Sequence, residues 1–171
     1  MDARRESEST PMKNRTTVEK KSEREVVVMR TFDAPARIVF EAWTRADLFK
    51  AWWAPKSMGM SIVSCEMDVR VGGGYRIEIR HPAAPDPVPF FGKYLEVTPP
   101  TRLVWSNDEG GDEGSITTVT FEEKNGRTRV MLSELYPSKA AFEASGGAAD
   151  AMPTNKKRAV TSCARQGIAS P

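Results

Sequence analysis

The stretch DAPARIVFEAW at Asp33–Trp43, followed by WWAP at Trp52–Pro55, decides the fold of this chain. Apolar residues recur in the first stretch at the spacing of an amphipathic helix. Asp33 is the expected cap of that helix, and Pro35 lies near its first turn, where a missing N–H costs nothing. A second short helix, from about residue 46 to residue 52, ends at Pro55. Two small helices thus interrupt the strands once and early, so a ligand or a later helix must cover the concave face of the sheet.

The remainder of the folded part has the apolar–polar alternation of antiparallel strands. Asn125-Gly126 between two such runs is a strong hairpin signal. Ser138 is the expected cap of a closing helix, which Gly146-Gly147 weakens and Pro153 ends. We predict an α+β fold in which one strand, two short helices and six strands of a curved antiparallel sheet precede a C-terminal helix. The expected strands are 25–32, 60–70, 75–80, 90–97, 101–106, 115–122 and 127–134.

Length and composition place the chain among globular single-domain proteins. A chain of 171 residues is long enough for one sizeable core. No apolar run approaches the roughly 20 residues that span a bilayer, and the N-terminus lacks the apolar core of a signal peptide. The chain is therefore expected to be cytoplasmic and not to insert into a membrane. The two cysteines, Cys65 and Cys163, and the single histidine, His81, predict no disulfide framework, no metal site and no cofactor.

Charge is concentrated at the two ends of the chain. The formal net charge is +2, but residues 1–24 contribute +2 and residues 153–171 contribute +4, so the middle of the chain carries −4. Basic ends are poor evidence for a nucleic-acid surface, which gathers Lys and Arg on a folded face. We expect no nucleic-acid partner, a disordered tail over 1–23, one domain over 24–152, and a basic, flexible tail over 153–171.

Six short motifs of the chain are Phe32–Pro35, Val39–Trp43, Trp52–Pro55, Asp68–Gly73, Gly92–Val97 and Pro99–Val104. Together they resemble the START-related helix-grip (SRPBCC) superfamily, and within it the family named after the activator of heat-shock protein 90 ATPase, in its small bacterial form. The likeness covers about residues 25 to 142. The resemblance implies a helix-grip fold, in which a curved sheet grips a long C-terminal helix with an apolar cavity between them. Members of the superfamily bind lipids, sterols or polyketides, some are cyclases, and a few are co-chaperones.

The C-terminus departs from the family pattern. Members usually carry a Gly-Trp motif and then a long amphipathic helix, whereas here Gly146–Met152 begins that segment and Pro153–Arg158 interrupts it. Residues 159–171 look like an unrelated reading frame, which resequencing of the coding region would test. A shortened helix leaves the cavity open or sealed by a second chain, and the apolar surface that it uncovers predicts a homodimer.

Aromatic and apolar residues supply the candidates for a cavity wall. Trp52 and Trp53 are neighbours that cannot both face inward, so one of them is expected at the cavity mouth, while Trp43 is expected in the core. The inner face of the strands would line either a solid core or a pocket. Tyr75 and Tyr94 could orient a ligand through their hydroxyl groups or make structural hydrogen bonds. The cavity-lining candidates are Phe49, Trp52, Trp53, Val63, Cys65, Met67, Tyr75, Ile77, Tyr94, Trp105 and Phe142.

Catalytic candidates are few. Glu66 and Glu78 fall on the solvent side of the alternation, and His81 lies at a proline-rich loop. Glu96 and Glu134 are the carboxylates that could point inward, although no second group is fixed opposite either of them. The Gly72–Gly74 run is a hairpin turn rather than a phosphate loop, because no helix and no lysine follow it. The Cys65 thiol on the apolar side is expected to be inert.

These patterns predict a binding protein for a hydrophobic small molecule, apolar, aromatic or lipid, without catalytic residues. The alternatives are a cyclase-like or hydrolase-like enzyme that uses the same cavity, and a co-chaperone or other interaction module acting through the outer face of the sheet. A chaperone partner would be revealed by a pull-down, and an enzyme by loss of turnover on replacing Glu96 or Glu134.

Overall fold

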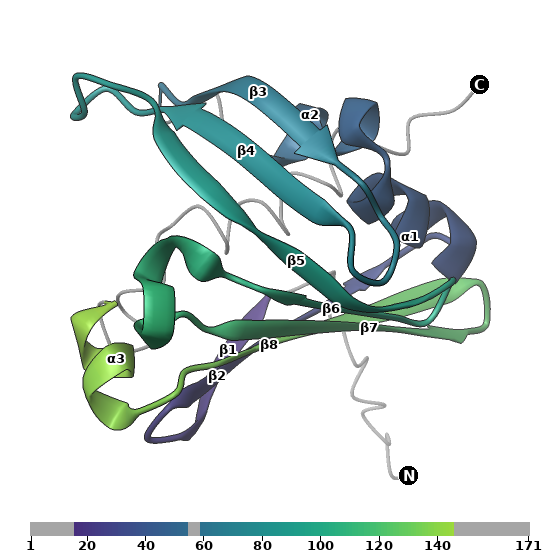
Figure 1. Cartoon of the computed structure of the whole chain (residues 1–171). Helices are drawn as coiled ribbons and strands as arrows, with labels where there is room; N and C mark the ends of the chain where they lie inside the picture. The colour runs from purple at the N-terminus through teal and green to yellow at the C-terminus, as the bar shows by residue number, and fades with distance from the viewer. Residues whose placement is uncertain (1–15, 55–58, 146–171) are drawn as a thin grey trace, which may run out of the picture.

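The structure, a computed structural model, describes residues 16–54 and 59–145. All eight strands of the described chain form one antiparallel sheet in the order β1-β2-β8-β7-β6-β5-β4-β3, and the sheet curls on itself (Figure 1). The predicted α+β class and the curved antiparallel sheet are confirmed. The elements are β1 Thr17–Ser22, β2 Glu25–Phe32, α1 Ala36–Thr44, α2 Ala46–Trp53, β3 Ser61–Met67, β4 Gly74–Arg80, β5 Val88–Thr98, β6 Arg102–Ser106, the 3₁₀ helix η2 Asp108–Glu113, β7 Ile116–Lys124, β8 Arg127–Leu135 and α3 Lys139–Ala144.

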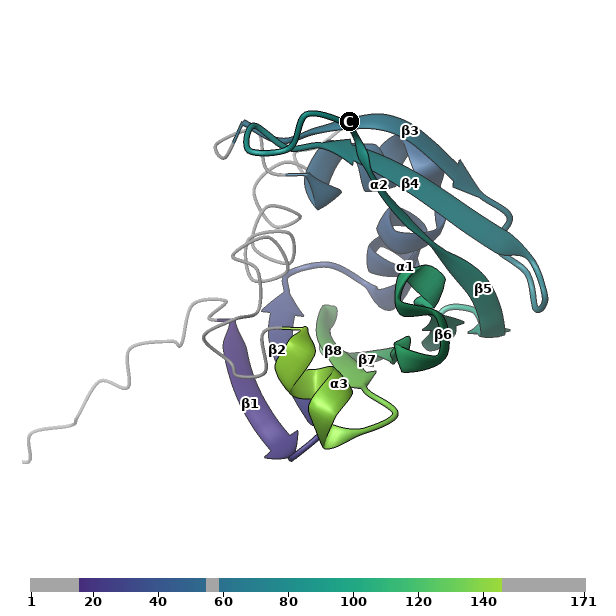
Figure 2. The same cartoon turned by 60° about the vertical axis from the view of Figure 1, so that its left-hand side comes forward.

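The curl is centred on β5, which belongs to both halves of the sheet. Residues 88–93 of β5 pair with β4, and residues 94–98 pair with β6. Between these halves, a Cβ atom on Gly92 would lie 1.8 Å from the carbonyl oxygen of Ser106. Only glycine allows this approach. As a result β3 and β4 fold over the rest of the sheet, with α1 and α2 at one end of the curve and α3 and η2 at the other (Figures 1 and 2).

Helix α1 forms because four of its nine residues bury apolar side chains against the sheet. Phe40 and Trp43 contact the ring of Phe121 on β7, with centroids 5.3 and 6.1 Å away. Burying each large apolar side chain contributes roughly 1.5–3 kcal/mol. The core continues through β6, β7 and β8, where Leu103, Val119 and Leu132 are fully buried. The predicted Asn-Gly hairpin is also present, since Asn125 and Gly126 both have positive φ, 54° and 71°.

The N-terminal boundary differs from the expectation. Strand β1 occupies Thr17–Ser22, within the stretch expected to be disordered, and pairs with β2 from Thr17↔Met29 to Ser22↔Glu25. Its side chains are mostly exposed, so main-chain hydrogen bonds to the edge of β2 hold it rather than apolar burial. The amino-acid composition of residues 17–22 therefore does not indicate a strand. The expected tail over 1–23 must be corrected at residues 17–22, and the other tail expectations, over residues 1–15 and 153–171, lie outside the described residues.

The cap of α1 also differs. Pro35, not Asp33, is the N-cap, and Oδ1 of Asp33 accepts from Nε of Arg127 at 2.6 Å. The backbone N–H of Ala36 instead donates to Oε2 of Glu123 at 2.8 Å. A carboxylate from the β7–β8 hairpin thus replaces the local cap. The predicted cap of α3 is confirmed, since Oγ of Ser138 accepts from the N–H of Ala141 at 3.0 Å.

Two register shifts change which residues face inward. In β3 the pairing shifts between Ile62 and Ser64, and in β5 it shifts between Tyr94 and Glu96. One extra residue at each position reverses the inward–outward alternation of the residues beyond it. Val63 is therefore 49% exposed, and the side chain of Glu96, just beyond the shift in β5, is 43% exposed.

Candidate ligand cavity

A cavity of about 570 Å³ lies inside the curl. Its wall is contributed by α1, α2, strands β3 to β8, η2 and α3. Ligand cavities of this volume are common in small-molecule binding proteins. Eight aromatic side chains line it, and they are Trp43, Phe49, Trp53, Tyr75, Phe90, Tyr94, Trp105 and Tyr136.

Ring contacts between helices and strands hold this wall in place. Trp43 of α1 lies 6.2 Å from Trp105 of β6, centroid to centroid, and 6.5 Å from Trp53 of α2. The Phe49 ring stacks on Trp53 at 4.7 Å, and Tyr94 contacts Trp105 edge to face at 6.4 Å. Each such pair contributes about 0.5–1.5 kcal/mol beyond burial. These contacts link α1, α2, β5 and β6 in one wall.

One end of the cavity is polar, and Asn107 connects its groups. Oδ1 of Asn107 lies 3.0 Å from the hydroxyl of Tyr75 and accepts from Nε1 of Trp105 at 3.3 Å. Nδ2 of Asn107 donates to Oγ1 of Thr117 at 2.8 Å and to Oγ of Ser115 at 3.0 Å. Three segments separated in sequence, around residues 75, 105–107 and 115–117, therefore meet at one amide.

The hydrogen bonds of Asn107 continue through Ser115 to Glu134 of β8. Oγ of Ser115 donates to Oε1 of Glu134 at 2.8 Å. Glu134 is only 6% exposed, and it reaches the cavity because it lies opposite Thr117 in the β7–β8 ladder, on the inward face. A buried carboxylate needs hydrogen-bond donors to offset its lost hydration, and Ser115 supplies one of them.

The tyrosines of the cavity hold their protons tightly. Burial raises the pKa of Tyr75 and of Tyr94 well above the usual value of 10. Burial, and after it the charge of Glu134, raises the pKa of Tyr136 to about 12. All three hydroxyl groups are therefore neutral at physiological pH, and they act as hydrogen-bonding groups.

The mouth of the cavity lies between η2 and α3. The lining residues with exposed surface are found there, whereas the aromatic wall is buried or half-buried. Figure 2 shows η2 and α3 at the same end of the curl. The exposed lining residues are Glu109, Gly110, Ala140, Ala144 and Ser145.

Seven residues expected from the sequence line the cavity: Phe49, Trp53, Met67, Tyr75, Ile77, Tyr94 and Trp105. Four others lie elsewhere. Trp52 is in the core, where Nε1 donates to the carbonyl of Ala42 at 2.8 Å, so Trp53 is the member of the pair that reaches the cavity. Val63 is exposed because of the register shift in β3. Cys65 packs against the core, and Phe142 packs on Tyr136 at 5.4 Å.

Sequence reasoning missed most of the polar end. Asn107, Ser115 and Thr117 lie at or near turns, where such residues are common for local reasons, so nothing in their pattern indicated a cavity. Trp43 is in the core as expected, and one side of it also faces the cavity. Phe90 could have been recognised, because it precedes Gly92 and Tyr94 at the strand period.

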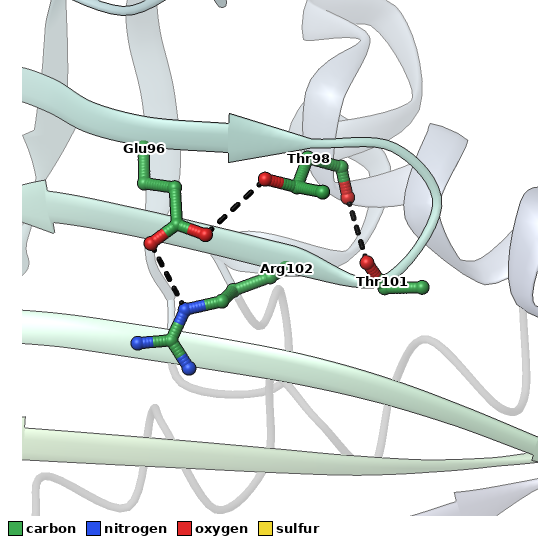
Figure 3. Close-up of polar contacts among 4 residues, drawn as sticks. All are labelled: Glu96, Thr98, Thr101 and Arg102. Atoms are coloured by element: carbon green, nitrogen blue, oxygen red, sulfur yellow. Dashed lines mark hydrogen bonds and ion pairs between the residues drawn. The ribbon is translucent and has the colours of Figure 1, made fainter.

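The two carboxylates expected to point inward have different positions. Glu96 lies on the outer face, 43% of its side chain is exposed, and its Oε2 accepts from Nε of Arg102 at 3.0 Å (Figure 3). The register shift next to Leu95 turns it outward. Thr98 donates to its other oxygen at 3.2 Å. Glu96 therefore belongs to a surface ion pair, and Glu134 is the carboxylate that lines the cavity.

The remaining reactive groups lie outside the cavity. Burial raises the pKa of the Cys65 thiol, which disfavours the thiolate. His81 accepts from the N–H of Ala83 in its loop. Within residues 16–54 and 59–145, no three His, Cys, Asp or Glu side chains are grouped to hold a metal ion. No helix in that part of the chain is long and apolar enough to cross a membrane.

A family model described as activator of Hsp90 ATPase homolog 1-like protein matches residues 33–165. Solved structures give the same fold. A protein of Rhodobacter sphaeroides superposes with a TM-score of 0.74 at 20% identity, covering 88% of this chain and 96% of its own. The AHSA1-like protein of Aeromonas hydrophila has a TM-score of 0.62 at 21% identity, covering 86% and 99%. At these identities the likeness establishes the helix-grip fold alone. No curated protein matches the chain.

Proposed function

Since the chain belongs to the activator of Hsp90 ATPase homolog 1-like family, we propose that it is a binding protein for an apolar or aromatic small molecule or lipid. The family and the fold indicate a ligand-binding or co-chaperone-like module. The observation that supports the binding function is the cavity of about 570 Å³ with eight aromatic side chains in its wall.

The energetics of this wall favour a hydrophobic guest. Apolar surface removed from water contributes roughly 25 cal/mol per Å², and the aromatic rings are already held by one another, so little ordering is needed on binding. Nε1 of Trp43 is a buried donor with no hydrogen-bond partner among the described residues. A buried donor left unpaired costs about 1–3 kcal/mol, and a guest that carries an acceptor would offset this cost.

Titration of the full chain with the neutral fluorophore N-phenyl-1-naphthylamine tests the proposal. We expect a saturable rise in fluorescence at one site per chain. Met67→Trp fills the cavity from β3 and should weaken binding at least tenfold. Glu66→Trp places the same ring on the outer face of the same strand and should leave binding unchanged. Binding that does not saturate, or that both variants affect equally, would contradict the proposal.

An enzyme that uses the same cavity is the second candidate, because Glu134 is a buried carboxylate beside the cavity, hydrogen-bonded to Ser115. Such a group can act as a general acid or base. Small molecules that co-purify with the protein would be extracted and incubated with fresh protein. Mass spectrometry would then show whether any of them is converted. Conversion that Glu134→Gln abolishes and Glu96→Gln preserves would establish this function, and unchanged compounds would count against it.

A co-chaperone role is the third candidate and has its own test. The tagged chain would be used to capture partners, with the surface variant Glu66→Trp as a control for the outer face of β3. Enrichment of an ATPase chaperone would support this role, and capture of no chaperone would count against it.

A further inference from the structure

The three tyrosines of the cavity differ in the partners of their hydroxyl groups. The Tyr75 hydroxyl lies 2.9 Å from the carbonyl oxygen of Ser106 and 3.0 Å from Oδ1 of Asn107. The Tyr136 hydroxyl also has side-chain hydrogen-bonding partners within the protein. The Tyr94 hydroxyl makes no hydrogen bond within the part of the chain that the structure describes. A buried hydroxyl ordinarily has a partner, so Tyr94 is the exception that needs an explanation.

Tyr94 is held where the two halves of the sheet meet. Its N–H donates to the carbonyl of Gly73 and its carbonyl accepts from the N–H of Gly72, both at 2.8 Å. Its ring contacts the rings of Tyr75 and Trp105, with centroids 5.9 and 6.4 Å away. The residue is only 4% exposed and lines the cavity. Backbone and ring are therefore fixed, and the hydroxyl stays inside the protein.

The Tyr94 hydroxyl borders the open space of the cavity. It is not among the described side-chain oxygens that the protein closes off completely without a partner, and its ring belongs to the cavity wall. Burial, and after it the charge of the Cys65 thiolate, raises the pKa of Tyr94. The hydroxyl is thus protonated and directed toward β3, away from the hydrogen bonds of Asn107. A guest meets here a neutral group with one donor hydrogen.

The surroundings of this hydroxyl favour a neutral acceptor over an anion. No Lys, Arg or His is among the described residues that line the cavity, and its charged lining side chains are Glu109 and Glu134. Lys50 of α2, whose charge acts on the Cys65 thiol, is exposed and lies outside the wall. A carboxylate guest would be buried without a counter-charge, which is costly, whereas a carbonyl group needs only a hydrogen bond.

We propose that the Tyr94 hydroxyl is the polar anchor of the cavity, and that its ligands are neutral carbonyl compounds, ketones or esters, with an apolar or aromatic body. The carbonyl oxygen accepts from the hydroxyl while the body lies against the rings of Tyr75 and Trp105. A carbonyl group conjugated to an aromatic ring is flat, which suits such a wall. This inference rests on the proposed binding function and names its ligand class.

Three matched ligands test this assignment: 2-acetylnaphthalene, 2-isopropenylnaphthalene and 2-naphthoic acid. The ketone and the hydrocarbon have nearly the same shape, but only the ketone carries an acceptor, and the acid is negatively charged at neutral pH. Their affinities for the full chain would be measured by displacement of N-phenyl-1-naphthylamine. Tyr94→Phe keeps the ring and should weaken the ketone about fivefold, while the affinity for the hydrocarbon changes by less than about twofold. The acid should bind weakest of the three.

Thr118→Val is the matched control, because it removes a hydroxyl group from the outer face of β7. It should leave the affinities for the ketone and the hydrocarbon unchanged. Equal weakening of both ligands by Tyr94→Phe, or tightest binding of the acid, would overturn the inference while leaving the binding function in place. A loss of ketone affinity that Tyr75→Phe causes and Tyr94→Phe does not would also overturn it.

Infrared spectroscopy gives a second readout that does not depend on the folding of a variant. The ligand is 2-acetylnaphthalene labelled with carbon-13 at its carbonyl. Bound to the unaltered chain, it should show the carbonyl stretch at a lower wavenumber than in hexane, and Tyr94→Phe should move the stretch back toward the hexane value. A hexane-like stretch in the unaltered chain would refute the assignment. Failure of all three ligands and of the fluorophore to bind would instead remove the binding function itself.

Discussion

Tyr136 shows how the cavity controls the chemistry of one residue. Its ring packs against Phe142 at 5.4 Å, and its hydroxyl lies at the polar end of the cavity, near Glu134 and Ser115. Burial, and after it the charge of Glu134, raises the pKa of Tyr136 to about 12 from its ordinary value of 10. Because the raised pKa belongs to the folded state, the neutral hydroxyl is favoured by folding.

This shift predicts the response to alkaline pH. Below pH 10 the tyrosine is protonated in both states, and its full contribution to stability is present. Between pH 10 and pH 12 the unfolded chain loses the proton and the folded chain keeps it, so the free energy of unfolding falls. Absorbance at 295 nm after a pH jump should show tyrosinate forming above pH 11, and Tyr136→Phe should remove the lowest step. A step near pH 10 that disappears in Tyr136→Phe would contradict the burial of this hydroxyl.

Among the elements, α1 depends on a residue distant in sequence. Its first N–H donates to Glu123, at the end of β7, rather than to the nearby Asp33. Helix N-termini lose about 1 kcal/mol when a capping side chain is removed. Glu123→Ala should therefore lower the free energy of unfolding by about 1 kcal/mol in urea denaturation. Glu122→Ala, its exposed neighbour on β7, should change it by less than about 0.5 kcal/mol, and equal effects would show that the contact does not stabilise the helix.

Strand β3 provides a direct test of the register shift. Simple alternation from Cys65 and Met67 places Val63 inside, whereas the shifted register exposes Val63 and packs Ile62 against the core. Ile62→Ser should destabilise the protein by about 1.5 kcal/mol. Val63→Ser should cost less than about 0.5 kcal/mol, as surface changes do. If the order of the two values is reversed in urea unfolding, the register of β3 is wrong.

At the scale of the whole molecule, the cavity exists because β5 passes from one half of the sheet to the other. Gly92 allows this passage, since a Cβ atom there would meet the Ser106 carbonyl at 1.8 Å and the Tyr75 ring at 3.1 Å. Both neighbours belong to the polar end of the cavity, because the Tyr75 hydroxyl lies 2.9 Å from that carbonyl oxygen. Both the curl of the sheet and the hydrogen bonds at the polar end thus depend on the absence of a Cβ atom at Gly92.

Gly92→Ala should therefore impair both stability and the cavity. We expect a loss of about 3 kcal/mol or more in the free energy of unfolding and weaker binding of N-phenyl-1-naphthylamine. Gly74→Ala on β4 is the matched control, because a Cβ atom there lies 3.7 Å from the nearest backbone oxygen, an ordinary contact. Comparable thermal unfolding of the two variants would show that the close approach at Gly92 is dispensable.

The sequence also predicts a homodimer, and this remains a prediction about the whole molecule. Large exposed apolar side chains include Val63, Val71 and Leu95, and β3 is an edge strand of the sheet. Strand edges are open to pairing with a second chain. Light scattering over a range of concentrations should give twice the mass of the chain, and a monomer at high concentration would contradict the prediction.

The sequence by itself determined the order of β2, α1, α2, the strands β3 to β8 and α3. Helical spacing in Asp33–Trp43, alternation in the later strands, and the turn at Asn125-Gly126 are local signals, because each depends on contacts between residues close in the chain. These signals were sufficient for the fold and for seven of the lining residues. The residues they placed are those whose inward position follows from an uninterrupted alternation, such as Tyr75 and Ile77.

Only the tertiary structure decided the register shifts, strand β1 and the polar end of the cavity, because these features depend on pairing between segments distant in the sequence. Register shifts in β3 and β5 turned Val63 and Glu96 outward, and a shift of one residue reverses a face without any change of local pattern. Strand β1 forms through the main chain of β2, which composition does not reveal. The polar end joins Tyr75, Asn107 and Glu134 across separate strands and loops, and only the curl of the sheet brings these groups to one end of an aromatic cavity.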